Sequence, residues 1–204
     1  MPRPPQILAL AGSARRASYN KLLVRIAVHG AEAAGVPCTL IDLRDYPLPI
    51  YDADLESEEG LPANAARLKG LFVDHPGLLI ASPEYNSSIT PLLKNTIDWV
   101  SRSAEASVDL SGFQGRVAGI MAASPGPLGG LRGLVVLRSI LSNIGCTVLA
   151  NQVSIRQAAQ AFDADGQLVD AKRQAAVEAL GRNLAEWVVR LQAPAAHARA
   201  QELD

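Results

Sequence analysis

The chain has 204 residues, of which 49% are hydrophobic, and a formal net charge of −1 at pH 7. This length suits one domain with a sizeable core, and the near-neutral charge gives no basic surface of the kind that binds nucleic acid or an anionic membrane. No apolar run is long enough to span a bilayer, and the N-terminal residues lack the apolar core of a signal peptide. Cys38 and Cys146 lie in apolar runs, which favours reduced thiols over a disulfide. We therefore expect a soluble cytoplasmic protein without nucleic-acid or membrane partners.

Short apolar runs alternate with stretches of helical spacing along the chain. The apolar runs predict strands at 7–11, 38–43, 77–83, 116–124 and 146–150. Helical spacing predicts helices at 19–34, 63–73, from Pro91 onward, at 131–143 and at 170–191. Continuous apolar strands separated by helices are typical of a parallel sheet covered on both faces. The pattern predicts one doubly wound α/β domain over residues 1–192, followed by a frayed tail at 193–204.

Three further expectations concern packing. Thr90 is a good N-cap for a helix whose first residue is Pro91. That helix should bury Leu92, Leu93, Ile97 and either Trp99 or Val100. The segment 44–62 is acidic and rich in proline, so we expect a polar loop outside the core. The last helix should bury one face, consisting of Val177, Leu180, Leu184, Trp187, Val188 and Leu191.

Polar loops rich in glycine or proline follow three of the predicted strands. They read GSARRASYN (12–20), SPEYNSS (82–88) and SPGPLGG (124–130). In a doubly wound sheet, ligands bind outside the carboxyl ends of the strands, where these three loops would meet. The sequence therefore predicts a ligand site along this edge.

The first of these loops has the composition of a phosphate site. A helix that begins near Ser18 or Tyr19 directs free N–H groups and its positive dipole end at the loop. The side chains of Ser13, Arg15, Ser18 and Asn20 would complete the site without a metal, with Arg15 inward and Arg16 in solvent. The alternative is a capped helix start beside a surface basic pair. Neither a Walker loop nor a G-x-G-x-x-G fingerprint is present in this turn, so a mononucleotide phosphate suits it better than a pyrophosphate.

These motifs together resemble a known family. GSARRASYN is similar to the G-S-x-R-x-x-S-x-N signature of the NADPH-dependent FMN reductases, which include quinone, azo-dye and chromate reductases. SPEYNSSITPLLKNTIDW (82–99) resembles their second signature, and PIYDADLE with GLP resembles their acidic loop. The resemblance covers roughly residues 7–191. It implies a flavodoxin-like fold with five parallel strands in the order 2-1-3-4-5, and FMN as the cofactor.

The resemblance also assigns twelve residues to the flavin. The phosphate would be held by Ser13, Arg15, Ser18 and Asn20, and Tyr19 would also contact the cofactor. The isoalloxazine ring would lie along Pro83, Glu84, Tyr85 and Asn86, largely through backbone groups. Ser124, Pro125 and Gly126 would close the other side. Two positions depart from the family: many relatives place a proline one residue before Pro91, and Pro125 lacks a backbone donor, which makes Gly126 the safer contact.

The implied chemistry resides in the cofactor, and no catalytic side chain or metal is expected. NADPH or NADH would reduce FMN, and quinones, azo compounds, oxidised metals or free flavin would then take the electrons in a ping-pong scheme. Arg102 or Arg132 could contact a ribose phosphate of the nicotinamide nucleotide. The family is commonly dimeric or tetrameric, and the apolar bias of 131–145 is compatible with a helix that packs on a partner.

Two alternatives remain open from the sequence. One is a flavodoxin-like electron carrier that docks a protein partner, although such carriers usually need an acidic surface. The other is a non-enzymatic module that binds a phosphate ligand in the same loop.

Overall fold

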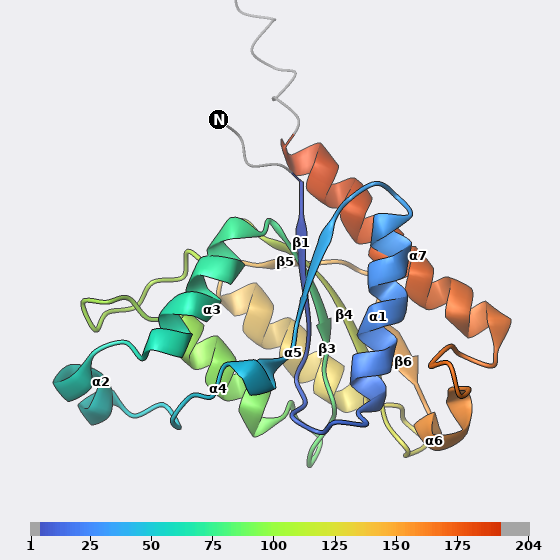
Figure 1. Ribbon diagram of the computed structural model, residues 1–204, viewed down its shortest axis with the longest axis horizontal. Coiled ribbons are helices and arrows are strands. Elements are labelled where there is room, and N and C mark those ends of the chain that lie inside the picture. The colour runs from blue at the N-terminus through green and yellow to red at the C-terminus, as the bar shows by residue number, and fades with distance from the viewer. Residues whose placement is uncertain (1–4, 193–204) are drawn as a thin grey trace, which may run out of the picture.

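The computed structural model describes residues 5–192, which form a three-layer α/β domain around a parallel sheet (Figure 1). The sheet is built from β1 (Ile7–Ala11), β2 (Cys38–Ile41), β3 (Gly77–Ala81), β4 (Val117–Ala123), β5 (Thr147–Val148) and β6 (Val153–Ile155). Its order is β2-β1-β3-β4-β5, with β6 also paired to β4, and every pairing is parallel. The predicted doubly wound topology is confirmed. The predicted tail at 193–204 lies outside the described residues.

The edge of the sheet beside β4 differs from the single fifth strand predicted at 146–150. β5 pairs with the start of β4, and β6, which the sequence did not indicate, pairs with its end. Between them the guanidinium of Arg138 donates to the carbonyls of Val148 and Leu149, at 3.2 and 2.8 Å, and to the side chain of Gln152 at 3.0 Å. The side chain of Arg138 thus holds the chain between the two strands in an irregular conformation, and the ladder resumes at Val153.

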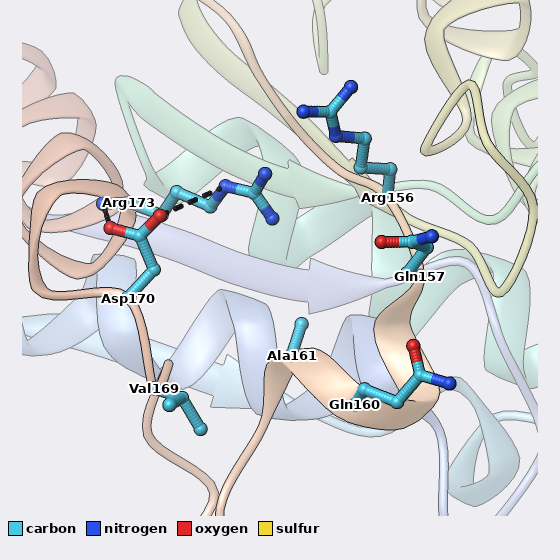
Figure 2. A pocket seen from close by; sticks show the side chains of 7 residues that line it. All are labelled: Arg156, Gln157, Gln160, Ala161, Val169, Asp170 and Arg173. Carbon is cyan, nitrogen blue, oxygen red and sulfur yellow. Dashed lines mark hydrogen bonds and ion pairs between the residues drawn. The ribbon is translucent and has the colours of Figure 1, made fainter.

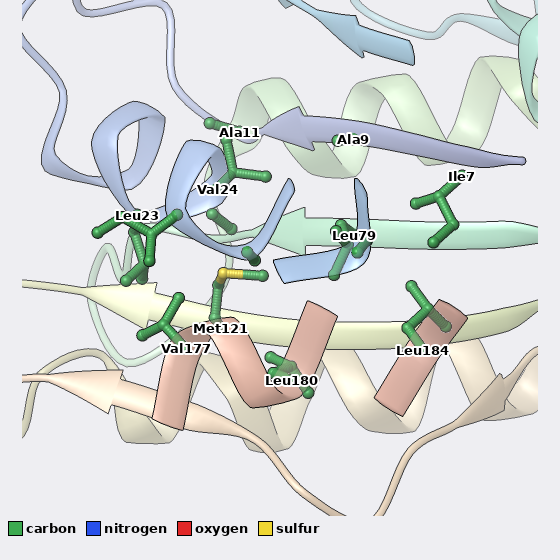
Figure 3. Packing of buried hydrophobic residues seen from close by; sticks show 14 of the residues in the cluster. Ile7, Ala9, Ala11, Leu23, Val24, Leu79, Met121, Val177, Leu180 and Leu184 are labelled. Atoms are coloured by element: carbon green, nitrogen blue, oxygen red, sulfur yellow. The ribbon is translucent and has the colours of Figure 1, made fainter. Parts of the chain in front are cut away.

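Two helices cover one face of the sheet, α1 (Tyr19–Glu32) and α7 (Ala171–Gln192). Residues Ile7, Ala9 and Ala11 of β1 face them, together with Leu79 and Met121 of neighbouring strands (Figure 3). The opposite face is covered by α3 (Ala63–Asp74), α4 (Pro91–Val100) and α5 (Leu131–Asn143). These helices pack on the alternate strand residues. The bounds of α5 are those predicted, and Thr90 caps α4 by accepting from the N–H of Leu93 at 3.1 Å, as expected.

The buried face of α7 is rotated from the predicted one. Val177, Leu180, Leu184 and Val188 are buried as expected, but Trp187 and Leu191 keep 45% and 52% of their surface exposed. Small residues explain the rotation, because Gly181 and Ala185 are also buried and turn the helix toward α1. A Cβ at Gly181 would overlap the carbonyl oxygen of Ala27 on α1. In α4, Leu93 and Ile97 are buried as expected, whereas Leu92 is only half-buried.

The acidic segment 44–62 is more ordered than predicted. After the 3₁₀ helix η1 (Leu43–Asp45), it forms α2 (Ala53–Glu59), which is capped by Asp52 through the N–H of Asp54 at 2.9 Å. Glu56 on α2 is buried and accepts from Nε of Arg102 at 2.8 and 2.9 Å. The expectation of a loop outside the core was therefore wrong at Glu56, because a cation distant in the sequence neutralises its charge. A short helix, α6 (Ala158–Ala161), was also not predicted.

Candidate functional site

The loop after β1 brings two buried hydroxyl groups to the N-terminus of α1. Ser13 and Ser18 expose 7% and 5% of their surface. Ser18 has the extended backbone of an N-cap residue, yet its side chain makes no capping hydrogen bond. The first N–H groups of α1 therefore remain uncapped by Ser18, and the positive end of the helix dipole faces the loop. This combination suits an anion.

The two arginines of this loop lie differently. Both are exposed, but the Arg15 guanidinium lies over the ring of Tyr19, 5.7 Å from its centroid. Tyr19 in turn stacks on Phe162, with 5.8 Å between the ring centroids. Arg15 lines the pocket described below, and Arg16 does not.

Asn20 ties this loop to β4. Its Nδ2 donates to the carbonyl of Ala123 at 2.9 Å, and its Oδ1 accepts from the N–H of Ala123 at 2.9 Å. The side chain, which the sequence suggested as a phosphate ligand, thus binds the last residue of β4. Its backbone N–H still belongs to the open first turn of α1.

A second tie joins the first loop to the start of α4. Thr90 donates its hydroxyl to the carbonyl of Gly12 at 2.7 Å. Gly12 lies so close to α4 that a Cβ there would come 2.9 Å from Cβ of Leu93. Glycine permits this approach, which fixes the first loop beside the second.

The loop after β3 ends in a tight turn with Asn86 and Ser87 at its tip. Tyr85 and Ser88 exchange backbone hydrogen bonds of 3.0 and 2.9 Å, and φ is +50° at Asn86 and +66° at Ser87. Positive φ at both central residues is the signature of a type I′ turn. The turn leaves the Tyr85 side chain 56% exposed at the rim of the site rather than packed beneath the loop.

The carboxylate of Glu84 is bonded to the start of α5. It accepts from the N–H of Gly133 at 3.1 Å and from Nε of Arg132 at 2.9 Å. Burial acts to raise the pKa of Glu84, but these two donors outweigh it and hold the pKa below its ordinary value. Glu84 is therefore a carboxylate that ties the second loop to α5.

The loop after β4 closes on itself. Ser124 Oγ accepts from the N–H of Gly126 at 3.2 Å, so the donor that the sequence singled out as a contact is already bonded within the loop. The chain then turns sharply at Gly130, where φ is +89° and a Cβ would come 2.6 Å from that of Ala122. Only glycine fits this position, which starts α5 close to the sheet.

The three loops converge on one small pocket of about 100 Å³. Its lining residues are Ser13, Arg15, Ser18, Tyr19, Asn20, Pro83, Glu84, Tyr85, Ala123, Ser124 and Pro125. All the residues predicted for the site are here except Asn86 at the turn tip and Gly126. Ala123 was not predicted, because nothing in a buried strand end distinguishes it. Larger hollows exist, such as one of about 340 Å³ beside β5, but this pocket combines an open helix N-terminus, hydroxyls and an arginine.

Other chemistries find little support within residues 5–192. No group of three histidine, cysteine or carboxylate side chains could hold a metal ion there. Burial raises the pKa of both Cys38 and Cys146 to about 12, so neither thiol is an activated nucleophile. No helix in this part of the chain has the length and apolarity needed to cross a membrane.

Sequence comparison decides the family. Residues 5–160 match the model of the NADPH-dependent FMN reductases, a stretch that contains all three loops. The chain belongs to this family. As an NADPH-dependent FMN reductase family member, it is an NAD(P)H-dependent oxidoreductase, with FMN as its flavin.

Individual relatives agree with this assignment. An NAD(P)H-dependent FMN reductase from Pseudomonas aeruginosa is 35% identical over 187 residues, which are 91% of this chain and 96% of the relative. A quinone reductase from Escherichia coli is 35% identical over 144 residues, covering 71% of this chain and 73% of the relative. Among solved structures, the flavoenzyme NAD(P)H:acceptor oxidoreductase FerB from Paracoccus denitrificans aligns with a TM-score of 0.76 at 26% identity, over 91% of this chain and 98% of that one.

The pocket of this family member fits the phosphate of FMN. Ser13, Ser18 and the first turn of α1 supply uncharged donors, and Arg15 supplies a cation at the rim. The arginines considered for the nicotinamide nucleotide, by contrast, are both paired with carboxylates. Arg102 pairs with Glu56 at 2.8 Å and Arg132 pairs with Glu84 at 2.7 Å.

Proposed function

We propose that this protein binds FMN in the three-loop pocket and transfers electrons from NADPH or NADH to small-molecule acceptors, with quinones as the principal class. The observation that carries the proposal is the convergence of the three loops on a pocket at the N-terminus of α1. The family assignment and the quinone reductase relatives support the direction of electron flow and the acceptor class. We also propose azo compounds, oxidised metals and free flavin as electron acceptors.

The phosphate end of the site would use the uncapped turn of α1. The N–H groups of Tyr19 and Asn20, the hydroxyls of Ser13 and Ser18 and the Arg15 guanidinium would donate to the phosphate oxygens. When bound, FMN supplies hydride acceptance from the nicotinamide and electron donation to the second substrate.

The other two loops would hold and shape the ring end. The segment from Pro83 to Asn86 would lie along one side of the ring, with Ser124, Pro125 and Gly126 across from it. The carboxylate of Glu84 is fixed by Arg132 and Gly133, so this segment would present backbone groups. Tyr85, which is exposed at the rim, would give a planar substrate a surface to stack on.

If both substrates stack at Tyr85, they must bind in turn. The nicotinamide nucleotide would leave before the acceptor enters, which is a ping-pong scheme. Steady-state rates measured against both substrates should give parallel lines in double-reciprocal plots. Intersecting lines would show that both substrates are bound together and would remove this scheme.

The first test is the absorbance spectrum of the purified protein, repeated anaerobically after NADPH is added. We expect a flavin spectrum that bleaches within seconds and recovers when a quinone is added. A flavin spectrum that bleaches with neither NADPH nor NADH would favour an electron carrier instead. A colourless protein that takes up no FMN would overturn the proposal and favour a phosphate-binding module.

Arg15 and its neighbour Arg16 form a matched pair for the phosphate site. Arg15→Ala should weaken FMN binding roughly 10- to 150-fold, since a charged hydrogen bond contributes about 1.5–3 kcal/mol. Arg16→Ala removes the same charge from a side chain outside the pocket and should change the affinity little. Equal flavin dissociation constants for the two variants would contradict the role given to Arg15.

We also propose that the protein forms a homo-oligomer in the cytoplasm, through an exposed apolar surface at the start of α5. Leu128, Leu131 and Val135 are 48%, 43% and 62% exposed around the start of α5, which Glu84 ties to the site. An apolar cluster of this kind suits a homodimer or homotetramer contact. Light scattering at working concentration should give at least twice the monomer mass, and a monomer would overturn this part of the proposal.

A further inference from the structure

A second hollow, of about 230 Å³, lies beyond β6 on the side of α6 and the start of α7 (Figure 2). Its lining residues are Arg156, Gln157, Gln160, Ala161, Val169, Asp170 and Arg173. In Figure 2 the side chains of Arg156 and Arg173 extend toward one another from opposite sides, and the Gln157 amide lies below Arg156. Two arginines that are distant in sequence therefore share one small hollow.

The charge in this hollow is only partly balanced. Within residues 5–192, Arg156 makes no ion pair. Arg173 pairs with Asp170 at 3.5 Å, but Oδ1 of Asp170 is also engaged, by the N–H groups of Lys172 and Arg173 at 2.9 and 3.2 Å. The lining of the hollow thus contains two guanidinium groups and one carboxylate, which leaves an excess positive charge for a ligand to neutralise.

The hollow shares a wall with the three-loop pocket. The N–H of Gln157 donates to the carbonyl of Gly126 at 3.3 Å, and the N–H of Ala158 donates to that of Ser124 at 3.1 Å. On the far side of α6, Phe162 stacks on Tyr19, which lines the three-loop pocket. A ligand that extends from the flavin site over the loop after β4 would reach the hollow next.

We propose that this hollow binds the 2′-phosphate end of NADPH. The proposal rests on the function proposed above, because it names the part of that enzyme's substrate that binds outside the flavin pocket. A phosphate monoester carries close to two negative charges and three acceptor oxygens, which match the donors of two guanidinium forks. The hollow is too small for a whole dinucleotide and has room for a ribose phosphate. NADH lacks this phosphate, so the site would favour NADPH.

The test compares Arg156→Ala with Arg182→Ala, which removes an exposed arginine of α7 that does not line the hollow. Calorimetry with 2′,5′-ADP should give a dissociation constant about tenfold higher for Arg156→Ala and an unchanged one for Arg182→Ala, as expected for an exposed charged hydrogen bond. In steady-state assays, KM for NADPH should rise by a similar factor in Arg156→Ala, while kcat and KM for NADH stay the same. Arg156→Lys should recover part of the loss, because lysine keeps the charge without the fork.

Several results would overturn the proposal. One is an unchanged affinity of Arg156→Ala for 2′,5′-ADP, and another is an equal rise in KM for NADH and NADPH, which would indicate a contact to the part that both nucleotides share. Inorganic phosphate that binds wild-type protein as tightly as 2′,5′-ADP would show a general anion site instead. FMN content and melting temperature, measured on every variant, exclude a misfolded protein. If wild-type protein binds 2′,5′-ADP at Arg156 but takes up no FMN, the proposed function fails while this site stands.

Discussion

The two faces of the sheet are covered by helices that pack in different ways. On one face α1 and α7 approach until backbone meets backbone, because added Cβ atoms at Gly30 and Gly181 would overlap carbonyl oxygens of the opposite helix. On the other face the space is filled by large side chains. Phe72 and Phe113 pack with ring centroids 5.2 Å apart, and Trp99 is fully buried.

Charge also distinguishes the two faces. The second face carries the ion pair of Glu56 with Arg102, in which the side chains are 2% and 18% exposed. It also carries Lys69, which pairs with Asp109 at 2.9 Å and donates to the carbonyl of Val100 at 3.2 Å. The first face therefore depends on the absence of side-chain atoms at two positions, besides one ion pair of α1 between Lys21 and Asp42 at 2.6 Å. The second face depends on several charges that must stay ionised. Point mutations and changes of pH should therefore affect the stability of the two faces differently.

The largest effect is expected from Gly181→Ala. The added methyl group has no space against Ala27, so α1 and α7 must separate, and we expect a loss of about 3 kcal/mol in the free energy of unfolding. Gly70→Ala in α3 is the matched control, since a Cβ there meets nothing within 4 Å. It should stabilise the protein by about 0.5–1 kcal/mol through the helix propensity of alanine. Urea unfolding measures both, and similar values for the two variants would contradict the backbone contact.

Glu56→Ala should have the next largest effect, because it leaves the Arg102 guanidinium without its carboxylate. Breaking a fully buried pair costs about 3–5 kcal/mol, and the partial exposure of Arg102 reduces our expectation to about 2–3 kcal/mol. Glu186→Ala removes a pair with Arg190 in which both side chains are more than half exposed, at 4.0 Å, and should cost less than about 0.5 kcal/mol. If both variants unfold at the same urea concentration, the Glu56 pair does not stabilise the second face.

Acid should weaken the second face more than the first, where the Lys21–Asp42 pair also loses its charge. The hydrogen bond from Lys69, followed by those from Ser111, lowers the pKa of Asp109 to about 2, and the hydrogen bond from Arg102 lowers that of Glu56. Because each folded-state pKa lies below the unfolded one, the stabilisation is fully present above about pH 4 and is lost as the pH falls toward 2. Asp109→Asn should therefore flatten the dependence of stability on pH between 4 and 2. Gly181→Ala should lower stability about equally at every pH, and the same slope in wild type and Asp109→Asn would refute this assignment.

Local patterns predicted much of this architecture. The run Leu131–Asn143 has helical spacing between a glycine-rich loop and Gly145, and the helix there has the predicted bounds. Thr90 followed by Pro91 predicted a capped helix start, which the structure confirms. The positions of the polar loops followed from strand order, because the carboxyl ends of parallel strands share an edge.

Contacts between distant residues explain what the sequence did not predict. Asp52 followed by acidic residues has the pattern of a helix N-terminus, which is where α2 begins. The burial of Glu56, however, depends on Arg102, 46 positions away. Asn20 was read as a ligand because its partner, the backbone of Ala123, lies 103 positions away. A hydrogen bond to a distant backbone group cannot be predicted from residue types. From the sequence, an asparagine that joins two loops therefore cannot be distinguished from one that binds a phosphate.

Trp187 gives the smallest expected effect and tests the rotation of α7 directly. Helical spacing placed it on the buried stripe with Leu184, but it is 45% exposed while Leu184 is fully buried. Leu184→Ala should therefore lose about 2–5 kcal/mol of unfolding free energy, and Trp187→Ala less than about 1 kcal/mol, despite the larger side chain. If Trp187→Ala cost as much as Leu184→Ala, Trp187 would be buried in solution. The helix would then be rotated toward the position that spacing alone predicts, or a partner molecule would cover Trp187. Dilution separates the two, because only a partner contact depends on protein concentration.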